Sequence, residues 1–377
     1  MTRISVIIVS FNAPYFLEVC LESVCTALQG HEGEIIVVDN ASQEGCAEMI
    51  RDRFPQAQLI ANKSNTVFSK AVNLGVKQAS GEYILILNPD SILPEESLVE
   101  VLRYSEKQEN LGAVGCRFID GSGTLLPECK RNFPRVQSAI FKLLGINWGY
   151  YADHLDEREA GEVDVLTGAF MFMKRELFEK MNGFDERFFM FGEDIDLSYR
   201  INLAGYKNHY CGNVTMIHFK GESSVKDLAY MKHFYGALQI FYLKHYRHHA
   251  LGRSVLNFLV GLSIKFRTKV FHPGKTTVQQ AHSFSYLGER EPVFKALKSV
   301  LPGSNPQMAP DEEKAGAVED ELLFFDSANI SYSNIINYFD LLPKKIQKRI
   351  VSRSGEFYVG SDDPALPGET RLITGGS

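Results

Sequence analysis

Several features of secreted and membrane-spanning proteins are missing from this sequence. Its six cysteines are scattered and form no CxxC pair, so neither a zinc site nor a disulfide framework is predicted. No uninterrupted apolar stretch reaches the roughly 18 residues that span a bilayer. The apolar segment at residues 4–9 is too short, and too lightly flanked by positive charge, for a secretory signal. We therefore expect a cytoplasmic protein in a reducing compartment.

The sequence also lacks a large excess of charge of one sign. Its formal net charge is -6, and 45% of its 377 residues are hydrophobic and 23% charged. These values are ordinary for a soluble globular protein and give no general attraction to nucleic acid. A chain of this length exceeds one typical domain, so we expect two domains or one domain with large appendages.

Residues 1 to about 90 alternate between strand-like and helix-like patterns. The strand-like stretches lie at 4–9, 34–39, 58–61 and 83–87, and the helix-like stretches at 14–28, 45–54 and 68–79. Repeated βαβ units with short connections predict an α/β fold with a mainly parallel sheet. Apolar runs between 113 and 173 predict further strands of a mixed sheet. The long link at 127–162 is expected to be a lid, a binding loop or a disordered segment.

Residues 226–281 are unusually basic and aromatic. Between 226 and 275 there are nine Lys or Arg and one acid, Asp227, so nine minus one gives +8. Aromatic and apolar residues recur there at helical spacing: Phe234, Leu238, Phe241 and Tyr242. Such a pattern predicts an amphipathic segment that binds anionic lipid headgroups at a membrane surface. The alternative is a helical pair packed on the preceding domain, with its basic face in solvent.

The last part of the chain has no glycine-rich phosphate loop. Strand-like and helix-like stretches alternate between 282 and 371, but a single glycine, Gly288, follows the first strand. The G-x-G-x-x-G pattern is therefore absent. We predict a small, degenerate Rossmann-like α/β domain over 282–377, with a polar loop or linker at 303–320.

Two carboxylates follow predicted strands of the N-terminal sheet. Asp39 ends the strand at 34–39, and Asp90 closes an NPD stretch directly after the strand at 83–87. Ligands of open α/β sheets gather at the carboxyl ends of strands. Asp90 can there bind Mg²⁺ or Mn²⁺ that bridges phosphates, and Asp39 can accept hydrogen bonds from a base or ribose. Both residues are also typical of ordinary turns.

The acidic stretch GEDID at 192–196 opens a helix-like segment beside several aromatic residues. Crowded carboxylates near aromatic groups raise one another's proton affinity, which favours a general base. An acidic helix N-terminus stabilised by the macrodipole is the alternative. His218 follows in the strand-like MIHF stretch, where it is either a metal ligand or a buried core histidine.

Taken together, the VSFN, VDNAS, NPD, GED and HFKGES stretches resemble the family 2 glycosyltransferases, inverting enzymes of the GT-A fold. The resemblance covers residues 1–225, which would form the catalytic domain. It implies a nucleoside-diphosphate sugar donor and Mn²⁺ or Mg²⁺. The pattern looks most like bacterial rhamnosyltransferase-type members that act on lipid-linked saccharides in cell-surface polysaccharide synthesis. The resemblance thus suggests dTDP-rhamnose as donor and a peripheral position on the inner face of the cell membrane.

The resemblance also implies individual roles in catalysis and metal binding. Asp194 would be the base, with Glu193 supporting it or binding the acceptor, and Asp90 and His218 would be metal ligands. The implied donor-binding residues are Ser10, Asn12, Asp39, Asn65, Asn88 and Gly168.

The sequence departs from the family pattern at two positions. Asn88 replaces the first acid of the metal motif, and Val67 stands where related sequences commonly carry glycine. These departures leave open an inactive sugar-nucleotide-binding or scaffold protein of a polysaccharide assembly complex. Nucleotidyl transfer is disfavoured because no basic, glycine-rich triphosphate loop lies near the N-terminus. The 282–377 domain resembles part of the Rossmann-like domain of polyprenyl-phosphate sugar transferases and is expected to be degenerate or regulatory.

Overall fold

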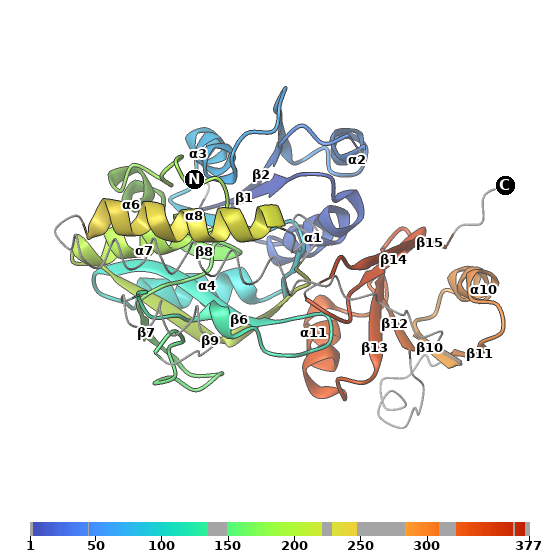
Figure 1. Cartoon of the computed structure of the whole chain (residues 1–377). Coiled ribbons are helices and arrows are strands. Elements are labelled where there is room, and N and C mark those ends of the chain that lie inside the picture. Colours follow the sequence, from blue (N-terminus) through green and yellow to red (C-terminus); the bar gives the residue numbers. More distant parts are fainter. Residues whose placement is uncertain are drawn as a thin grey trace.

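Two β-sheets with flanking helices make up the described part of the chain (Figure 1). The computed structural model describes residues 3–43, 45–134, 149–220, 228–246, 283–308, 322–364 and 366–373. The first sheet contains β1 (Ile4–Ser10), β2 (Gly33–Asp39), β3 (Gln58–Ala61), β4 (Tyr83–Leu87), β5 (Ser91–Ile92), β6 (Leu111–Ile119), β7 (Ala160–Val163), β8 (Phe170–Lys174) and β9 (Lys207–His218). Its helices are α1 (Pro14–Ala27), α2 (Cys46–Arg53), α3 (Phe68–Gln78), α4 (Ser97–Glu106), α6 (Arg175–Lys180) and α7 (Glu193–Leu203), with a short 3₁₀ helix η1 (Pro127–Cys129).

The first sheet runs in the order β3-β2-β1-β4-β8-β6-β9-β5, and β7 pairs with β9. Strands β3, β2, β1 and β4 are parallel, whereas β8 runs antiparallel to β4 and β6. Every residue of β1 and β4 is buried, as expected of central parallel strands covered on both faces. Helix α3 packs on β1 and β2. The predicted mixed, mainly parallel sheet is confirmed.

Helix bounds in the parallel half lie within a residue or two of the predicted ranges. Pro14 begins α1, where its missing N–H costs no intrahelical hydrogen bond. Glycine and asparagine mark several turns; Asn12, for example, has a positive φ of 52° in the loop between β1 and α1. Part of the 127–162 link is ordered, because Arg131 forms β-bridges with Tyr151 and Val165. Residues 135–148 of that link lie outside the described residues.

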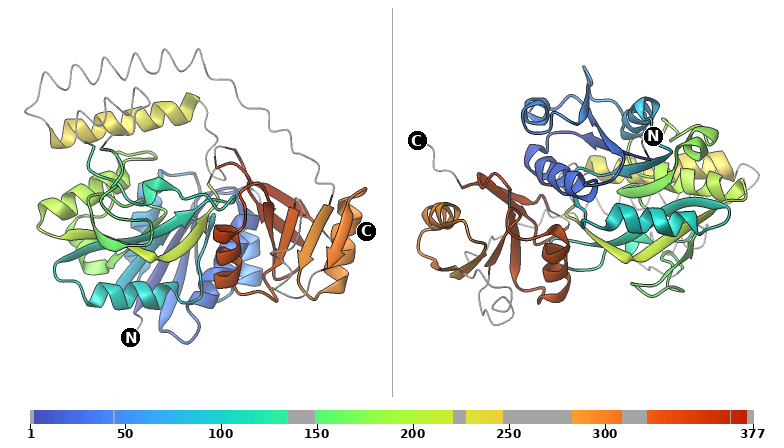
Figure 2. Two further views of the ribbon diagram at one scale, coloured as in Figure 1. Left: turned by 90° about the horizontal axis from the view of Figure 1, so that it is seen from below. Right: turned by 180° about the vertical axis from the view of Figure 1, so that it is seen from behind.

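Helix α8 (Leu228–His245) packs against the domain of the first sheet, and this corrects the membrane-binding prediction for part of 226–281 (Figure 2). Leu238, Phe241 and Tyr242 are buried in a cluster with Phe188 and Ile195. These side chains are therefore not available to a lipid surface, and their helical spacing reflects protein packing. The rest of the basic segment, including the apolar run at 255–264, lies outside the described residues. No helix in the described ranges is long and apolar enough to span a membrane.

The second sheet confirms the predicted C-terminal α/β unit. Its elements are β10 (Ser283–Leu287), α10 (Glu291–Val300), β11 (Asn305–Met308), β12 (Leu322–Asp326), α11 (Tyr332–Leu341), β13 (Gln347–Val351), β14 (Phe357–Gly360) and β15 (Glu369–Leu372). The strand order is β11-β10-β12-β13-β14-β15. Strand β11 corrects part of the predicted linker at 303–320, because a polar edge strand can pair through its backbone without an apolar pattern.

The two sheets share a hydrophobic core instead of being joined by a linker alone. Phe16 of α1, Ile92 of β5 and Phe219 after β9 belong to the same buried cluster as Ile335 and Phe339 of α11. Figures 1 and 2 show the second sheet beside α1 and the end of β9. The C-terminal unit thus packs against β5, which directly follows Asp90, and against β9, which ends at His218.

Candidate active site

The loops after β1 and β2 bring three predicted donor-binding residues together. Ser10 and Asp39 are paired neighbours at the carboxyl ends of β1 and β2. The backbone N–H of Asn12 donates to Ser42 Oγ over 3.0 Å, and Ser42 N–H donates to Asp39 Oδ1 over 3.3 Å. Asn12 Oδ1 accepts from the Gln43 N–H at 2.9 Å. Asp39 therefore accepts one backbone hydrogen bond, in a set of contacts that joins the two loops.

Asn40 joins this edge to the next loop, although its sequence position gave no separate signal. Its Nδ2 donates to Asn65 Oδ1 over 2.8 Å and to the Thr66 carbonyl over 2.6 Å. Its Oδ1 accepts from Asn62 Nδ2 and from the Thr66 N–H. Because Asn65 accepts this hydrogen bond, Asn40 fixes the loop that carries Asn65 against the end of β2.

Asn88, Asp90 and His218 meet at the carboxyl end of β4. Strand β5 pairs with β9, with Ser91 opposite His218, and this pairing brings the two motifs together across 128 positions of sequence. His218 Nε2 lies 3.3 Å from Asp90 Oδ1 and 3.2 Å from Asn88 Nδ2. All three side chains therefore surround one point, as the sequence predicted for Asp90 and His218.

The charge of Asp90 is stabilised by neighbouring basic groups. Burial alone would raise its pKa, but His218 and Lys220 outweigh that effect and lower the pKa below its ordinary value. The pKa of Glu128 is lowered in the same way. Burial opposes its charged form, whereas His218 and Lys220, its ion-pair partner, favour that form. One buried carboxylate, Asp90, and one half-buried carboxylate, Glu128, thus remain anionic around His218 and Lys220.

These residues fit a divalent cation. Apart from its contact with His218, Asp90 Oδ1 has no hydrogen-bond partner among the described residues although it is fully buried. One carboxylate oxygen and one imidazole nitrogen 3.3 Å apart can both ligate a single ion. No group of three or more His, Cys, Asp or Glu with metal-site geometry occurs in the described ranges. Such a site would complete its coordination with substrate phosphates and water, as Mg²⁺ commonly does.

The acidic pair Glu193–Asp194 begins α7 and lies against a turn at 167–169. Asp194 Oδ2 accepts from Arg131 Nη2 over 2.6 Å and from the Gly168 N–H over 3.2 Å. Asp194 Oδ1 accepts from the Ile195 N–H at 2.7 Å. The carboxylate is buried with one guanidinium partner, so its orientation is fixed. Gly168 contributes its backbone N–H here, and its predicted contact with a donor stays a prediction.

Glu193 has very different surroundings from Asp194. Its carboxyl group is buried, and its Oε2 has no hydrogen-bond partner among the described residues. Burial, reinforced by the negative charge of Asp194, raises the pKa of Glu193 to about 8. At neutral pH Glu193 is therefore mainly protonated and able to donate a hydrogen bond.

Short contacts connect the cluster of Asn88, Asp90 and His218 with the acidic pair Glu193–Asp194. The Asn88 N–H donates to the Ala169 carbonyl over 3.1 Å. Thr167 Oγ1 donates to the carbonyl of Glu128, whose side chain pairs with Lys220. The 167–169 turn thus lies between Asn88 on one side and Asp194 on the other.

Sequence reasoning did not find Arg131, Glu128 or Lys220. Lys220 lies inside the HFKGES stretch, and its positive φ of 62° has no signal in the sequence. Arg131 and Glu128 lie in the long link at 127–162, where no periodic pattern assigns a direction to a side chain. A buried Arg close to an acidic pair is found only from tertiary contacts.

Two known protein domains match parts of this chain. Residues 5–181 match the glycosyl transferase family 2 domain, and residues 158–235 match a domain described as the N-terminal domain of galactosyltransferase. The two matches overlap at the 167–169 turn, and the second contains Glu193, Asp194 and His218.

Similar proteins include several bacterial transferases. The chain is 26% identical over 242 residues to the N-acetylglucosaminyl-diphospho-decaprenol L-rhamnosyltransferase of Mycobacterium tuberculosis, covering 59% of this chain and 78% of that protein. It is 32% identical over 163 residues to the rhamnosyltransferase WbbL of Escherichia coli, covering 41% of this chain and 59% of WbbL. A solved mannosyltransferase from Pyrobaculum calidifontis is 18% identical, with a TM-score of 0.48 over 72% of this chain and 76% of that one.

Proposed function

We propose that this chain, whose residues 5–181 match the glycosyl transferase family 2 domain, transfers a sugar from a nucleoside-diphosphate donor to a lipid-linked saccharide acceptor with inversion. The rhamnosyltransferase names of the two bacterial relatives support rhamnose as the transferred sugar. We take dTDP-rhamnose as its donor and cell-surface polysaccharide synthesis as the setting. The observation that carries the proposal is the placement of Asp194 and the Asp90–His218 pair on either side of one turn.

In the proposed reaction Asp194 accepts the proton of an acceptor hydroxyl. The hydroxyl oxygen then forms a bond to the anomeric carbon while the bond from that carbon to the donor diphosphate breaks. The nucleoside diphosphate leaves with the electron pair, and a single displacement inverts the anomeric configuration. Arg131 and the Gly168 N–H hold Asp194 in one orientation, which favours a proton transfer worth roughly 10²–10⁴-fold.

Two buried atoms near Asp194 support acceptor binding at this place. Glu193 Oε2 and Arg131 Nε lack hydrogen-bond partners among the described residues. Buried polar groups without a partner are costly, so a ligand that supplies one is favoured. We assign these atoms to hydroxyl groups of the acceptor saccharide, with Glu193 donating in its protonated form.

Asp90 and His218 would hold Mn²⁺ or Mg²⁺ in this proposal. A bound divalent cation would neutralise charge on the departing diphosphate. Asn88 supplies an amide where the family pattern has an acid, so the protein contributes one carboxylate to the ion. The donor nucleotide itself would lie against Ser10, Asn12 and Asp39.

Replacing Asp194 with asparagine tests the proposed base. We expect Asp194→Asn to abolish sugar transfer while the dissociation constant for the donor stays within about twofold, because the hydrogen bonds of Asp194 go to Arg131, Gly168 and Ile195 and not to the loops after β1 and β2. Isothermal titration with the donor and a radiolabelled transfer assay measure the two quantities. Asp52→Asn, an exposed change on α2, is the control. Full turnover of the Asp194→Asn protein would rule out this role.

The alternative function is that of an inactive scaffold protein, because Asn88 and Val67 depart from the family pattern. An active enzyme should slowly hydrolyse its donor when supplied with Mn²⁺, and Asp90→Ala should remove that activity. An inactive protein would leave the donor intact in both cases. Thermal-shift measurements against UDP-, GDP- and dTDP-sugars would identify the nucleotide, since a ligand that binds the folded state raises its melting temperature.

We also propose that the basic residues after α8 attract an anionic membrane surface. Residues 247–275 carry six Lys or Arg and no Asp or Glu. A lipid-linked acceptor would make such contact useful. The purified protein should sediment with vesicles containing anionic lipid and not with neutral vesicles; equal recovery with both would contradict the proposal.

A further inference from the structure

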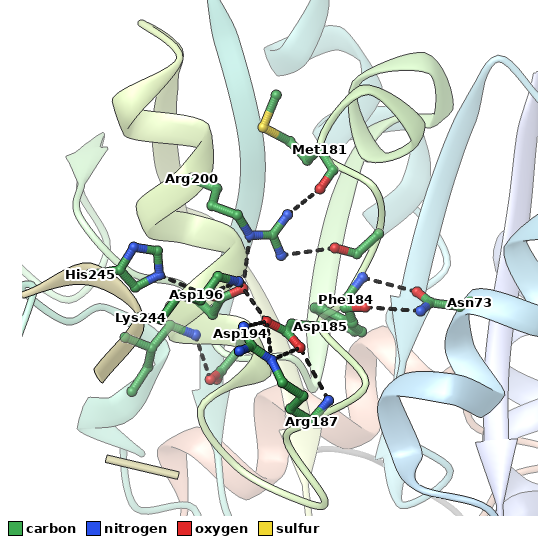
Figure 3. A network of polar contacts seen from close by, with 12 residues as sticks. Asn73, Met181, Phe184, Asp185, Arg187, Asp194, Asp196, Arg200, Lys244 and His245 are labelled. Atoms are coloured by element: carbon green, nitrogen blue, oxygen red, sulfur yellow. Dashed lines mark hydrogen bonds and ion pairs between the residues drawn. The ribbon is translucent and has the colours of Figure 1, made fainter. Parts of the chain in front are cut away.

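Asp196, two residues after the proposed base, is a buried acid with three basic partners (Figure 3). Its carboxylate accepts from Arg200 Nε over 2.8 Å and lies 2.7 Å from both Lys244 Nζ and His245 Nε2. Arg200 belongs to the same helix, whereas Lys244 and His245 end α8. An acid that served only the α7 macrodipole would need neither burial nor partners on another helix. Asp196 therefore connects α7 to α8.

Lys244 also reaches the start of the loop that leads into α7. Its Nζ lies 2.7 Å from Asp185 Oδ2 as well as from Asp196. One ammonium group thus bridges the two ends of the stretch from 185 to 196. Arg200 fixes the preceding turn, because its guanidinium donates to the carbonyl of Met181 and, over 2.8 Å, to that of Gly183. Figure 3 shows these groups converging from both sides of the loop.

The bridged loop has a backbone that needs external support. Phe191 and Gly192 adopt consecutive left-handed conformations, with φ of 69° and 83°. A bulky residue with positive φ is an outlier that persists where its surroundings hold it in place. Helix α8 provides part of that support, since a Cβ at Gly192 would lie 3.0 Å from Ala237 Cβ. The loop ends directly at Glu193 and Asp194.

We propose that Lys244 and His245 of α8 are positioning residues that set the 185–192 loop and the first turn of α7, and thereby the orientation of Asp194. The inference rests on the proposed function, because it takes Asp194 as the base. Both residues lie beyond residue 235, where the second family match ends. The proposed catalytic geometry therefore depends on the end of a helix that extends beyond the matched domains.

The geometry separates this positioning role from ordinary packing. Helix α8 is anchored independently by Leu238, Phe241 and Tyr242, which are buried against the catalytic domain. Lys244→Met keeps the aliphatic stem and removes only the ammonium group. The helix should stay docked while Asp185 and Asp196 lose their common partner. Lys244→Arg restores a cation of similar reach.

Steady-state kinetics and hydrogen exchange of the full chain test the inference. We expect Lys244→Met to lower kcat for transfer by about 10- to 100-fold, because small displacements of a reacting group are that costly. The donor dissociation constant should stay within about twofold. Backbone amides of 185–195 should exchange faster than in the unmodified protein, and Lys244→Arg should recover most of both properties. Lys107→Met, an exposed change at the end of α4, is the matched control.

Three outcomes would overturn the inference. These are an unchanged kcat in Lys244→Met, unchanged exchange of 185–195, or an equal loss in Lys244→Met and Lys244→Arg. If Lys244→Met does not fold, His245→Gln provides the same comparison of exchange and kcat. An inactive Asp194→Asn beside a normal Lys244→Met would refute the positioning role alone. A fully active Asp194→Asn would refute the proposed base whatever Lys244 does.

Discussion

Glu193 and Asp194 are adjacent residues whose surroundings assign them different chemical states. Asp194 lies 2.6 Å from the Arg131 guanidinium, whereas Glu193 Oε2 is buried without a partner among the described residues. The guanidinium contact fixes the orientation of the Asp194 carboxylate, whereas burial and the negative charge of Asp194 raise the pKa of Glu193. The difference follows from Arg131, which reaches one member of the pair.

The raised pKa of Glu193 predicts a pH dependence of stability. Its folded pKa of about 8 lies above the ordinary value of 4.5, so between these values the folded protein holds a proton that the unfolded chain releases. This contribution to stability is complete below about pH 4.5 and is lost as pH rises through 8. We expect the urea midpoint to fall less between pH 5 and pH 8 in Glu193→Gln than in the unmodified protein. Equal falls in both proteins would contradict the assignment.

At the residue scale, the sequence predicts the acids and the histidine but not their partners. Asp90, Asp194 and His218 lie in short motifs whose order carries information. Arg131 is 63 positions from Asp194, and Lys244 is 48 positions from Asp196. Such pairs depend on how separate elements pack, and neither partner lies in a pattern that indicates its direction.

At the scale of elements, β4, β5 and β9 determine where the proposed metal ligands Asp90 and His218 meet. β4 was predicted from its apolar run, and β9 in part from MIHF. β5 has only two residues, Ser91 and Ile92, so no periodicity could reveal it. Its pairing with β9 nevertheless brings Asp90 to His218. Short strands of this kind are set by tertiary pairing instead of local propensity.

Helix α8 shows how an amphipathic pattern can have two explanations. Leu238, Phe241 and Tyr242 would suit a lipid interface as well as a protein interface. The structure resolves the choice for these residues, because they are buried with Val165 and Ile195. The pattern predicts an apolar face correctly, but it does not identify the surface that covers this face.

At the scale of the whole molecule, the C-terminal unit is part of the body that carries the site. Glu95 accepts from the backbone N–H groups of Tyr332 and Ser333, over 2.7 and 2.8 Å, and so caps α11 from the catalytic domain. Arg117 of β6 makes two 3.0 Å hydrogen bonds to Asp340. The sequence predicted this α/β unit from its alternating pattern. It could not predict the shared core, because an apolar face has the same sequence pattern whether it packs within a domain or between domains.

The shared core predicts that the two units unfold together. Phe339 is fully buried between the sheets, beside Phe219 and Phe325. Phe339→Ala should destabilise the protein by about 3–5 kcal/mol, the usual cost of removing a buried phenyl ring. Calorimetry should show one transition that shifts to lower temperature as a whole. Two transitions, with that of the catalytic domain unmoved, would show that the units are independent.

The most direct test of the central claim is the transfer of radiolabelled sugar from dTDP-rhamnose to a lipid-linked saccharide, measured side by side for the unmodified protein and Asp194→Asn. The proposed site predicts Mn²⁺- or Mg²⁺-supported transfer by the unmodified protein and none by Asp194→Asn, with equal donor binding by both. Transfer at the same rate by both proteins would contradict the account.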